Sequence, residues 1–261
     1  FSKILCTFFA VLMVVTAFCM TVSASSAYQT YTYSVKGKAL YSPDAYTAIK
    51  AVNSDNMGLE LPIENPGDMV TDKAGNVYIA DTGNNRIVVL DRYYKVNFTI
   101  SEFSNDQGVP DRLTAPQGVF VSEPNEKYGK LIWVCDTGSN RIVVFDELGN
   151  FQRIVEEPES SLFDQDSVYK PVAMAVDSYN RLYVVSSTTY QGVIVMTDEG
   201  EFTGFIGAQA VQMSAWEIIW RRFQTKEQRE ASEQKVSTEF NNISINKNKG
   251  LVYVTTSTIE E

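Results

Sequence analysis

The sequence predicts an all-β fold of the β-propeller type, in which repeated four-stranded blades surround one axis. The main observation is a repeat, because the segment DTGNNRIVVLD from Asp81 to Asp91 returns as DTGSNRIVVFD from Asp136 to Asp146. The second observation is the composition around each copy, which consists of short runs of Val, Ile and Tyr bounded by Gly, Asn and Asp. Such runs are typical of strands and turns, and a unit of about 50 residues made of them indicates one blade per copy.

The first copy can be divided into the four strands of a blade. We expect an inner strand at Asp68–Thr71, a second at Val77–Ala80, a third at Arg86–Leu90 and an outer strand at Phe98–Phe103. The turns between the first three contain Gly and Asn, which tolerate positive φ angles. The middle strands are continuous apolar runs, so both faces of the sheet are expected to be covered by neighbouring blades.

Three further copies follow with decreasing regularity. The second and third blades are predicted at Pro116–Val155 and Pro171–Phe205, and a fourth begins at Phe240. In the third copy Ser186 replaces the Asp of the repeat, and the fourth keeps only the strand pattern. The first three copies are expected to place equivalent apolar residues on their inner strands, namely Val70, Val119 and Met174.

The repeat resembles the NHL repeat of β-propeller proteins, in particular of exported, bacterial-type ones. The resemblance is carried by the Pro that opens each copy, the Asp-x-x-Gly-x-x-Tyr turn of the first copy and the Asn-Arg-Ile motif. It is strongest in Pro66–Asp91 and Pro116–Asp146. NHL propellers usually close with about six blades. The resemblance therefore implies that this sequence, with about four blade starts, is truncated.

The N-terminal residues 1–27 have the pattern of a secretory signal peptide. Lys3 precedes a nearly continuous apolar run at Ile4–Val22, and small residues that suit cleavage follow at Ser23–Ala27. The alternative is an uncleaved membrane anchor, because about 19 apolar residues can span a bilayer. In both cases the propeller domain at residues 28–261 is expected to be secreted or extracytoplasmic, with membrane contact only through the N-terminal segment.

Charge and composition exclude several classes of function. The chain has 32 acidic and 22 basic residues and a net charge of −10. This balance argues against binding to nucleic acid, whose phosphates require Lys and Arg, and against adsorption to anionic lipid. The sequence has no His, so a Ser-His-Asp triad and a His-ligated zinc site are excluded within these residues. Cys135 is the one Cys after the signal segment and is expected to be a buried apolar residue rather than a nucleophile.

The fold is also distantly similar to the gluconolactonase-like propellers, which bind a divalent cation at the mouth of the channel. That resemblance implies candidate metal ligands just before and within the inner strands of the first and fourth copies. These candidates are Glu64, Asn65, Asp68, Asn241 and Asn242. The implied cofactor is Ca²⁺ or another divalent cation, because hard cations prefer oxygen ligands. The alternative is that Asn-Pro-Gly forms a turn and the acidic side chains are solvated.

The polar residues of the repeat itself are expected to be structural. The set Asp81, Asn85 and Arg86 recurs as Asp136, Asn140 and Arg141. A set that recurs at the same place in successive blades fits a scaffold better than a single ligand site. Asp and Asn side chains can cap backbone N–H groups in a turn, and Arg can bridge carboxylates or carbonyls of a neighbouring blade.

An insertion at residues 208–237 interrupts the period. Trp216, Ile219, Trp220 and Phe223 recur with the spacing of an amphipathic helix. We expect this helix to pack its Trp side chains on a blade. The alternative is a lid or docking helix, because long insertions in repeat folds often lie at the binding face. In that case the candidate binding residues are Trp216, Trp220, Arg221 and Arg222.

Two classes of function agree with these observations. The first is an exported scaffold without enzymatic activity that binds a protein, peptide or glycan with its loop face and inserted helix. The alternative is a divalent-metal-dependent hydrolase of the lactonase type that uses the oxygen ligands named above. No catalytic side chain can be assigned from the sequence, and fold alone does not distinguish the two classes.

Overall fold

The computed structural model describes residues 31–42, 49–160, 168–189, 192–207, 240–246 and 249–256. The predicted signal peptide and helical insertion lie outside these residues, and so do Trp216, Trp220, Arg221 and Arg222. The chain divides into two compact units, Phe1–Ala51 and Val52–Glu261. Within the described ranges, no helix is long and apolar enough to cross a membrane.

The described part of the first unit contains one short hairpin. Strand β1 (Tyr31–Tyr33) pairs antiparallel with β2 (Ala39–Tyr41), and Tyr31 lies opposite Tyr41. The rings of Tyr31 and Tyr33 meet edge to face at 5.5 Å between centroids.

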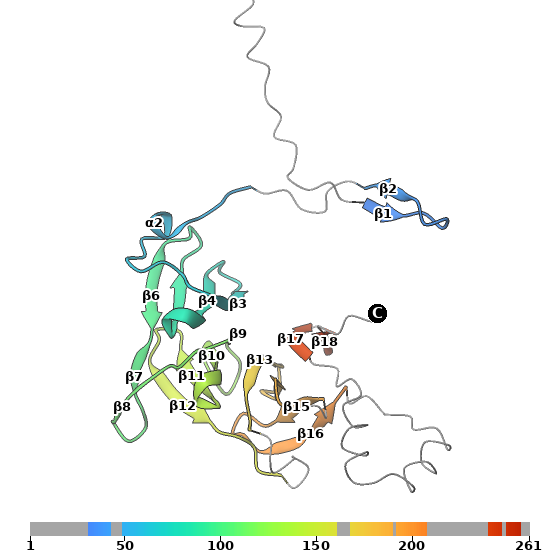
Figure 1. Ribbon diagram of the computed structural model, residues 1–261. Coiled ribbons are helices and arrows are strands. Elements are labelled where there is room, and N and C mark those ends of the chain that lie inside the picture. Colours follow the sequence, from blue (N-terminus) through green and yellow to red (C-terminus); the bar gives the residue numbers. More distant parts are fainter. Residues whose placement is uncertain are drawn as a thin grey trace, which may run out of the picture. The chain divides into compact units, whose positions relative to one another are not determined.

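The second unit contains three four-stranded antiparallel sheets that follow one another along the chain (Figure 1). The first sheet consists of β3 (Pro66–Thr71), β4 (Val77–Asp81), β5 (Arg86–Leu90) and β6 (Val96–Ile100). The second consists of β9 (Gly118–Ser122), β10 (Leu131–Asp136), β11 (Arg141–Asp146) and β12 (Phe151–Val155). The third consists of β13 (Pro171–Val176), β14 (Leu182–Ser186), β15 (Val193–Met196) and β16 (Phe202–Ile206). A fourth copy is described as the pair β17 (Phe240–Asn246) and β18 (Leu251–Thr256).

The inner strands of successive sheets lie side by side, as in a propeller. Strand β3 contacts β9, β9 contacts β13, and β13 contacts β17. Gly67 and Gly118 make this approach possible. A Cβ atom at Gly67 would lie 2.5 Å from the carbonyl oxygen of Gln117, and one at Gly118 would lie 2.6 Å from that of Val172. The predicted propeller blades are therefore confirmed, and Val70, Val119 and Met174 lie on inner strands.

The core lies between the blades, which explains the apolar middle strands. Tyr78 and Ile87 of the first blade pack with Val134 and Phe145 of the second. A corresponding cluster joins the second blade to the third, and another joins the third to β17. Every residue of β4 and of β10 is buried. Cys135 is fully buried in this core as predicted, and burial raises the pKa of its thiol well above its usual value.

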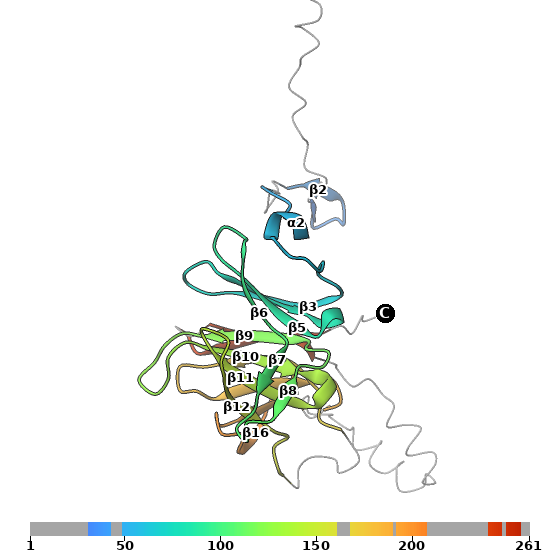
Figure 2. The ribbon, with the colours of Figure 1, turned by 90° about the vertical axis from the view of Figure 1, so that its left-hand side faces the viewer.

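The outer strand of the first blade differs from its prediction. The predicted strand at Phe98–Phe103 ends at Ile100, and Glu102–Ser104 instead forms β7, which pairs with β8 (Pro110–Arg112) in a separate hairpin. Phe103 anchors this hairpin on the second blade, where its ring contacts those of Phe145 and Phe151 at 5.3 Å each. Figure 2 shows the hairpin beside the strands of the second blade. A one-turn helix, α2 (Ser54–Met57), precedes the first blade and was not predicted.

Candidate functional site

The repeated Asp and Arg residues connect the first blade to the chain that precedes it. Asp81 is fully buried and accepts a hydrogen bond from the Glu64 N–H at 2.7 Å. Its other carboxylate oxygen lies 2.7 Å from Nε of Arg86. Arg86 also donates to the carbonyl oxygen of Leu61. The pair therefore holds the loop that leads into β3.

The second blade repeats this arrangement with different partners. Asp136 accepts from the Thr114 N–H at 2.6 Å and pairs with Nε of Arg141 at 2.9 Å. Arg141 in addition makes two hydrogen bonds to the carboxylate of Asp111, in the β7–β8 hairpin. Such bidentate pairing is the strongest geometry that Arg and a carboxylate can adopt.

The Thr and Asn residues of the repeat reach across to the next blade. Thr82 donates its hydroxyl to the Pro116 carbonyl, and Thr137 donates to that of Pro171, both at 2.6 Å. Asn85, which adopts a left-handed φ of 54°, accepts from the Ala115 N–H. The recurring polar set is thus structural, as predicted, since its contacts tie each blade to the chain around it.

The candidate metal residues of the first blade lie in the turn before β3 and near the start of that strand. Glu64 is exposed, and its backbone carbonyl accepts from the Gly83 N–H. Asn65 has a positive φ of 45°, which an Asn tolerates in a turn. Asp68 is half-buried, and its two carboxylate oxygens accept from the Met69 N–H at 2.8 Å and the Val119 N–H at 3.1 Å. Burial raises the pKa of Asp68, and these two hydrogen bonds oppose the rise.

The other two candidate ligands lie on the inner strand of the fourth copy. Asn241 accepts a hydrogen bond from the Thr255 hydroxyl, and Asn242 accepts from the N–H of Ile243. Strands β3, β13 and β17 share a register shift after their first residue, which places Asp68 and Asn242 at equivalent positions. Among the described residues, no hydrogen bond joins the candidates of the two blades, and no group of three or more Cys, Asp or Glu is arranged to hold a metal ion.

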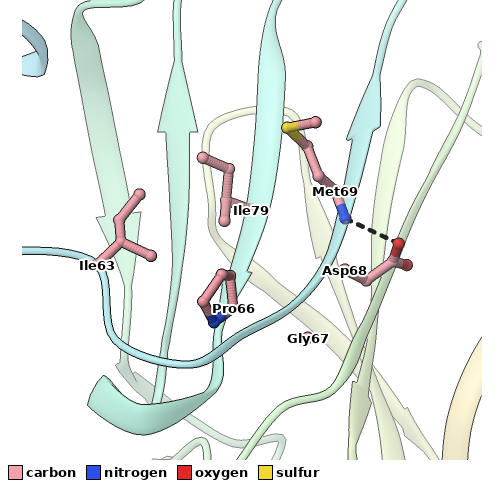
Figure 3. A pocket seen from close by; sticks show the side chains of 6 residues that line it. All are labelled: Ile63, Pro66, Gly67, Asp68, Met69 and Ile79. Atoms are coloured by element: carbon pink, nitrogen blue, oxygen red, sulfur yellow. Dashed lines mark hydrogen bonds between the residues drawn. The ribbon is translucent and has the colours of Figure 1, made fainter. Parts of the chain in front are cut away.

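A pocket of about 410 Å³ lies on the first blade, beside the candidate carboxylate (Figure 3). It is lined mainly by apolar residues from the loop before β3, from β3 and from β4, namely Ile63, Pro66, Gly67, Asp68, Met69 and Ile79. Met69 and Ile79 are paired across β3 and β4. The side chain of Met69 is 64% exposed, whereas Ile79 is buried. The sequence analysis missed this pocket, because it predicted only that Asp68–Thr71 is an inner strand.

The comparison with protein families agrees with the predicted type of repeat in the first blade. A family model for the NHL repeat matches residues 64–90, which cover the turn before β3 and the strands β3–β5. This stretch of the chain is similar to an NHL repeat. A curated relative is NHL repeat-containing protein 3 of Homo sapiens, which is 29% identical over 137 residues. The match covers 49% of this chain and 37% of the human protein.

Solved structures similar to this protein include a streptogramin B lyase and a gluconolactonase from Xanthomonas campestris. The lyase is 13% identical with a TM-score of 0.44, and the match covers 76% of this chain and 50% of the lyase. The gluconolactonase is 14% identical with a TM-score of 0.43, and the match covers 87% of this chain and 61% of the gluconolactonase. At this level of similarity, no activity is transferred from them.

The first two blades are also joined by an ion pair. Asp72, in the turn between β3 and β4, is buried and accepts from the backbone N–H groups of Ala74 and Asn76. Lys130 of the second blade reaches it with Nζ at 2.9 Å. Burial alone would raise the pKa of Asp72, but Lys130 and Asn76 outweigh it and lower the pKa to about 2.

We expect Asp72 to make the stability of the protein depend on pH. Its pKa in the folded state lies below its ordinary value of 3.8. The ionised carboxylate therefore stabilises the fold above about pH 4, and this contribution is lost as the pH falls towards about 2. Urea unfolding of the wild type and Asp72→Asn should differ in free energy by a constant amount between about pH 5 and 7 and by less below about pH 4. A difference that stays constant down to about pH 3 would contradict the assignment.

Proposed function

We propose that this protein is an exported binding scaffold whose first blade receives an apolar side chain of a protein or peptide partner. The observation that carries the proposal is the pocket beside Met69, which is open and mainly apolar. The recurring Asp, Thr, Asn and Arg side chains are, by contrast, engaged in holding the blades together. The proposal therefore rests on the apolar pocket of the first blade rather than on this recurring polar set.

The chemistry of the pocket suits an adaptable contact with a peptide. Met is unbranched and polarisable, so an exposed Met69 can adjust to side chains of different shape. Ile63, Pro66 and Ile79 supply further apolar surface to the pocket. Partner segments that combine an apolar side chain with a hydrogen-bond donor suit the site best, since the half-buried carboxylate of Asp68 borders it.

The partner classes predicted from the sequence are a protein, a peptide or a glycan, and the apolar pocket favours the first two. The inserted segment with Trp216, Trp220, Arg221 and Arg222 is proposed as a second contact for the same partner. Export follows from the predicted signal peptide at residues 1–27. Nucleic acid is not proposed as a partner, because the net charge is −10.

Selection of peptides from a displayed random library tests this function. We expect peptides with apolar anchors to be enriched on the purified protein and to lose at least about tenfold in affinity for Met69→Lys. The matched control is Leu148→Lys, since Leu148 is also exposed (73%) but lies in the turn between β11 and β12. Enriched peptides that bind Met69→Lys as tightly as the wild type would refute the pocket as the binding site.

The alternative function is a divalent-metal-dependent hydrolase of the lactonase type. The observation that favours it is the equivalent position of two oxygen-bearing residues, Asp68 and Asn242, on inner strands. Carboxylate and amide oxygens suit Ca²⁺, although both oxygens of Asp68 already accept backbone hydrogen bonds. When bound, the cation would supply Lewis-acid polarisation of a lactone carbonyl.

The two functions are separated by an assay of lactone hydrolysis with Ca²⁺ or Mn²⁺. The scaffold predicts no turnover above the uncatalysed rate. Turnover that disappears with a chelator and with Glu64→Gln or Asp68→Asn would establish the hydrolase instead. Hydrolysis would require the cation and the side chains of Glu64 and Asp68, whereas binding of a peptide in the apolar pocket requires no cation.

A further inference from the structure

The outer strands of the three blades share a β-bulge, in which one extra residue has no partner on the neighbouring strand. In the first blade, Val89 is paired with Phe98 and Leu90 with Val96, so Asn97 is the extra residue of a β-bulge on β6. The corresponding bulges in β12 and β16 leave Gln152 and Thr203 in the same position. A bulged residue is unpaired in the ladder and changes the direction of its side chain.

Of these three bulged residues, only Asn97 begins an Asn-x-Thr sequence. Asn97, Phe98 and Thr99 form an acceptor motif for N-linked glycosylation. Asn97 and Thr99 are both exposed, while Phe98 is half-buried between them. Phe98 packs on the second blade, where its ring lies close to the position that a Cβ of Gly149 would take, at 3.0 Å. The two residues that the transferase must recognise are therefore accessible to solvent.

Strand β6 is the last strand of its sheet, so its other edge has no neighbouring strand in that sheet. Edge strands in soluble proteins are usually protected against pairing with other chains. A glycan on the bulge would protect this edge.

We propose that Asn97 is an acceptor site for an N-linked glycan when the chain passes through a eukaryotic secretory pathway. The donor is an oligosaccharide linked to a lipid pyrophosphate. Nδ2 of Asn97 forms a bond to C1 of the first sugar, the bond from C1 to the pyrophosphate breaks, the lipid pyrophosphate leaves, and the amide loses one proton. The step involves no oxidation or reduction.

A second motif, Asn242-Ile243-Ser244, provides an internal comparison. Asn242 lies on the inner strand β17, which contacts β13, and its amide oxygen accepts a hydrogen bond from the next backbone N–H. Ile243 between the motif residues is buried. Asn242 and Ser244 are exposed as well, so the two motifs differ in their place in the blade, on an inner strand or on an outer one, rather than in exposure.

The test uses the full chain with residues 1–27 replaced by a well-characterised cleavable signal sequence, secreted from cultured mammalian cells. This replacement separates the glycosylation proposal from the prediction of the native signal peptide. We expect a mobility shift that peptide-N-glycosidase removes. Asn97→Gln and Thr99→Ala should each abolish it, whereas Thr99→Ser, which restores the motif, and Asn242→Gln should retain it.

Two results would overturn the proposal. The first is a secreted wild-type chain without a glycosidase-sensitive shift. The second is a shift of unchanged size in Asn97→Gln. Because Thr99→Ala leaves the bulged Asn in place, a folding defect in Asn97→Gln cannot produce the expected pattern by itself.

Discussion

Gly118→Ala should be among the most destabilising single-methyl substitutions in this protein, with a loss of about 3 kcal/mol in the free energy of unfolding. The added Cβ would lie 2.6 Å from the Val172 carbonyl oxygen and 3.1 Å from both the Ala173 Cα and the Cys135 Sγ. Two of these atoms belong to the backbone of the next blade. They can move away only if β9 and β13 separate, and that separation would open the buried cluster between the second and third blades.

Gly129→Ala is the matched control for this prediction. No atom lies within 4 Å of the position that its Cβ would take, and its φ is not in the left-handed region. We expect its stability to equal or slightly exceed that of the wild type, because Ala restricts the unfolded chain more than Gly does. Chemical denaturation of both variants measures the difference. Equal stability of the two variants would show that β9 and β13 are not in close contact.

Asp136→Ala should cost about 3–5 kcal/mol in the free energy of unfolding, the usual effect of removing one partner from a buried ion pair. The carboxylate is completely buried. Its loss would leave the Thr114 N–H without its acceptor and would remove one of the two carboxylates that hold Arg141. The β7–β8 hairpin should loosen as well, because Arg141 is its link through Asp111.

Asp146→Ala is the control for Asp136→Ala. Asp146 also accepts backbone hydrogen bonds, from the N–H groups of Leu148 and Asn150, but in a half-buried turn. Its loss should cost about 1 kcal/mol. Denaturant midpoints of the two variants at neutral pH provide the comparison. If Asp136→Ala were no more destabilising than Asp146→Ala, the recurring Asp would not have the structural role assigned to it.

Most of the strands of this protein could be predicted from its sequence because their signals are local. The third strand, Arg86–Leu90, agrees with its prediction at both ends, since Asn85 closes the preceding turn and four apolar residues follow Arg86. The β7–β8 hairpin was missed because Phe103 reads as a continuation of the outer strand. Asn105 and Gly108 could have indicated the turn of this hairpin, because Asn and Gly favour turns. In the structure the Asn105 side chain accepts from the N–H groups of Gln107 and Val109, and Gly108 has a φ of 72°.

The candidate site was less predictable, because its geometry depends on contacts between distant segments. The pairing of Arg141 with Asp111 spans 30 residues, and no motif in the sequence relates them. Ile63, Met69 and Ile79 line the pocket together, from a loop and from two strands. In the sequence each of them looks like a residue of the hydrophobic core, so nothing indicates the pocket. The position of Asp68 at the inner strand was predicted correctly. Its hydrogen bond from the Met69 N–H is local, whereas the one from the Val119 N–H depends on the packing of β3 against β9.

The central claim is that consecutive sequence repeats fold as blades that contact one another directly, and the ion pair between Asp72 and Lys130 provides the most direct measurement of it. The two residues lie in different blades, 58 positions apart, with Nζ and Oδ2 separated by 2.9 Å. A double-mutant cycle with Asp72→Asn, Lys130→Met and the double variant, followed by urea unfolding at pH 7, should give a coupling free energy of about 1–3 kcal/mol. Additive single effects, with a coupling free energy near zero, would contradict the contact between the blades.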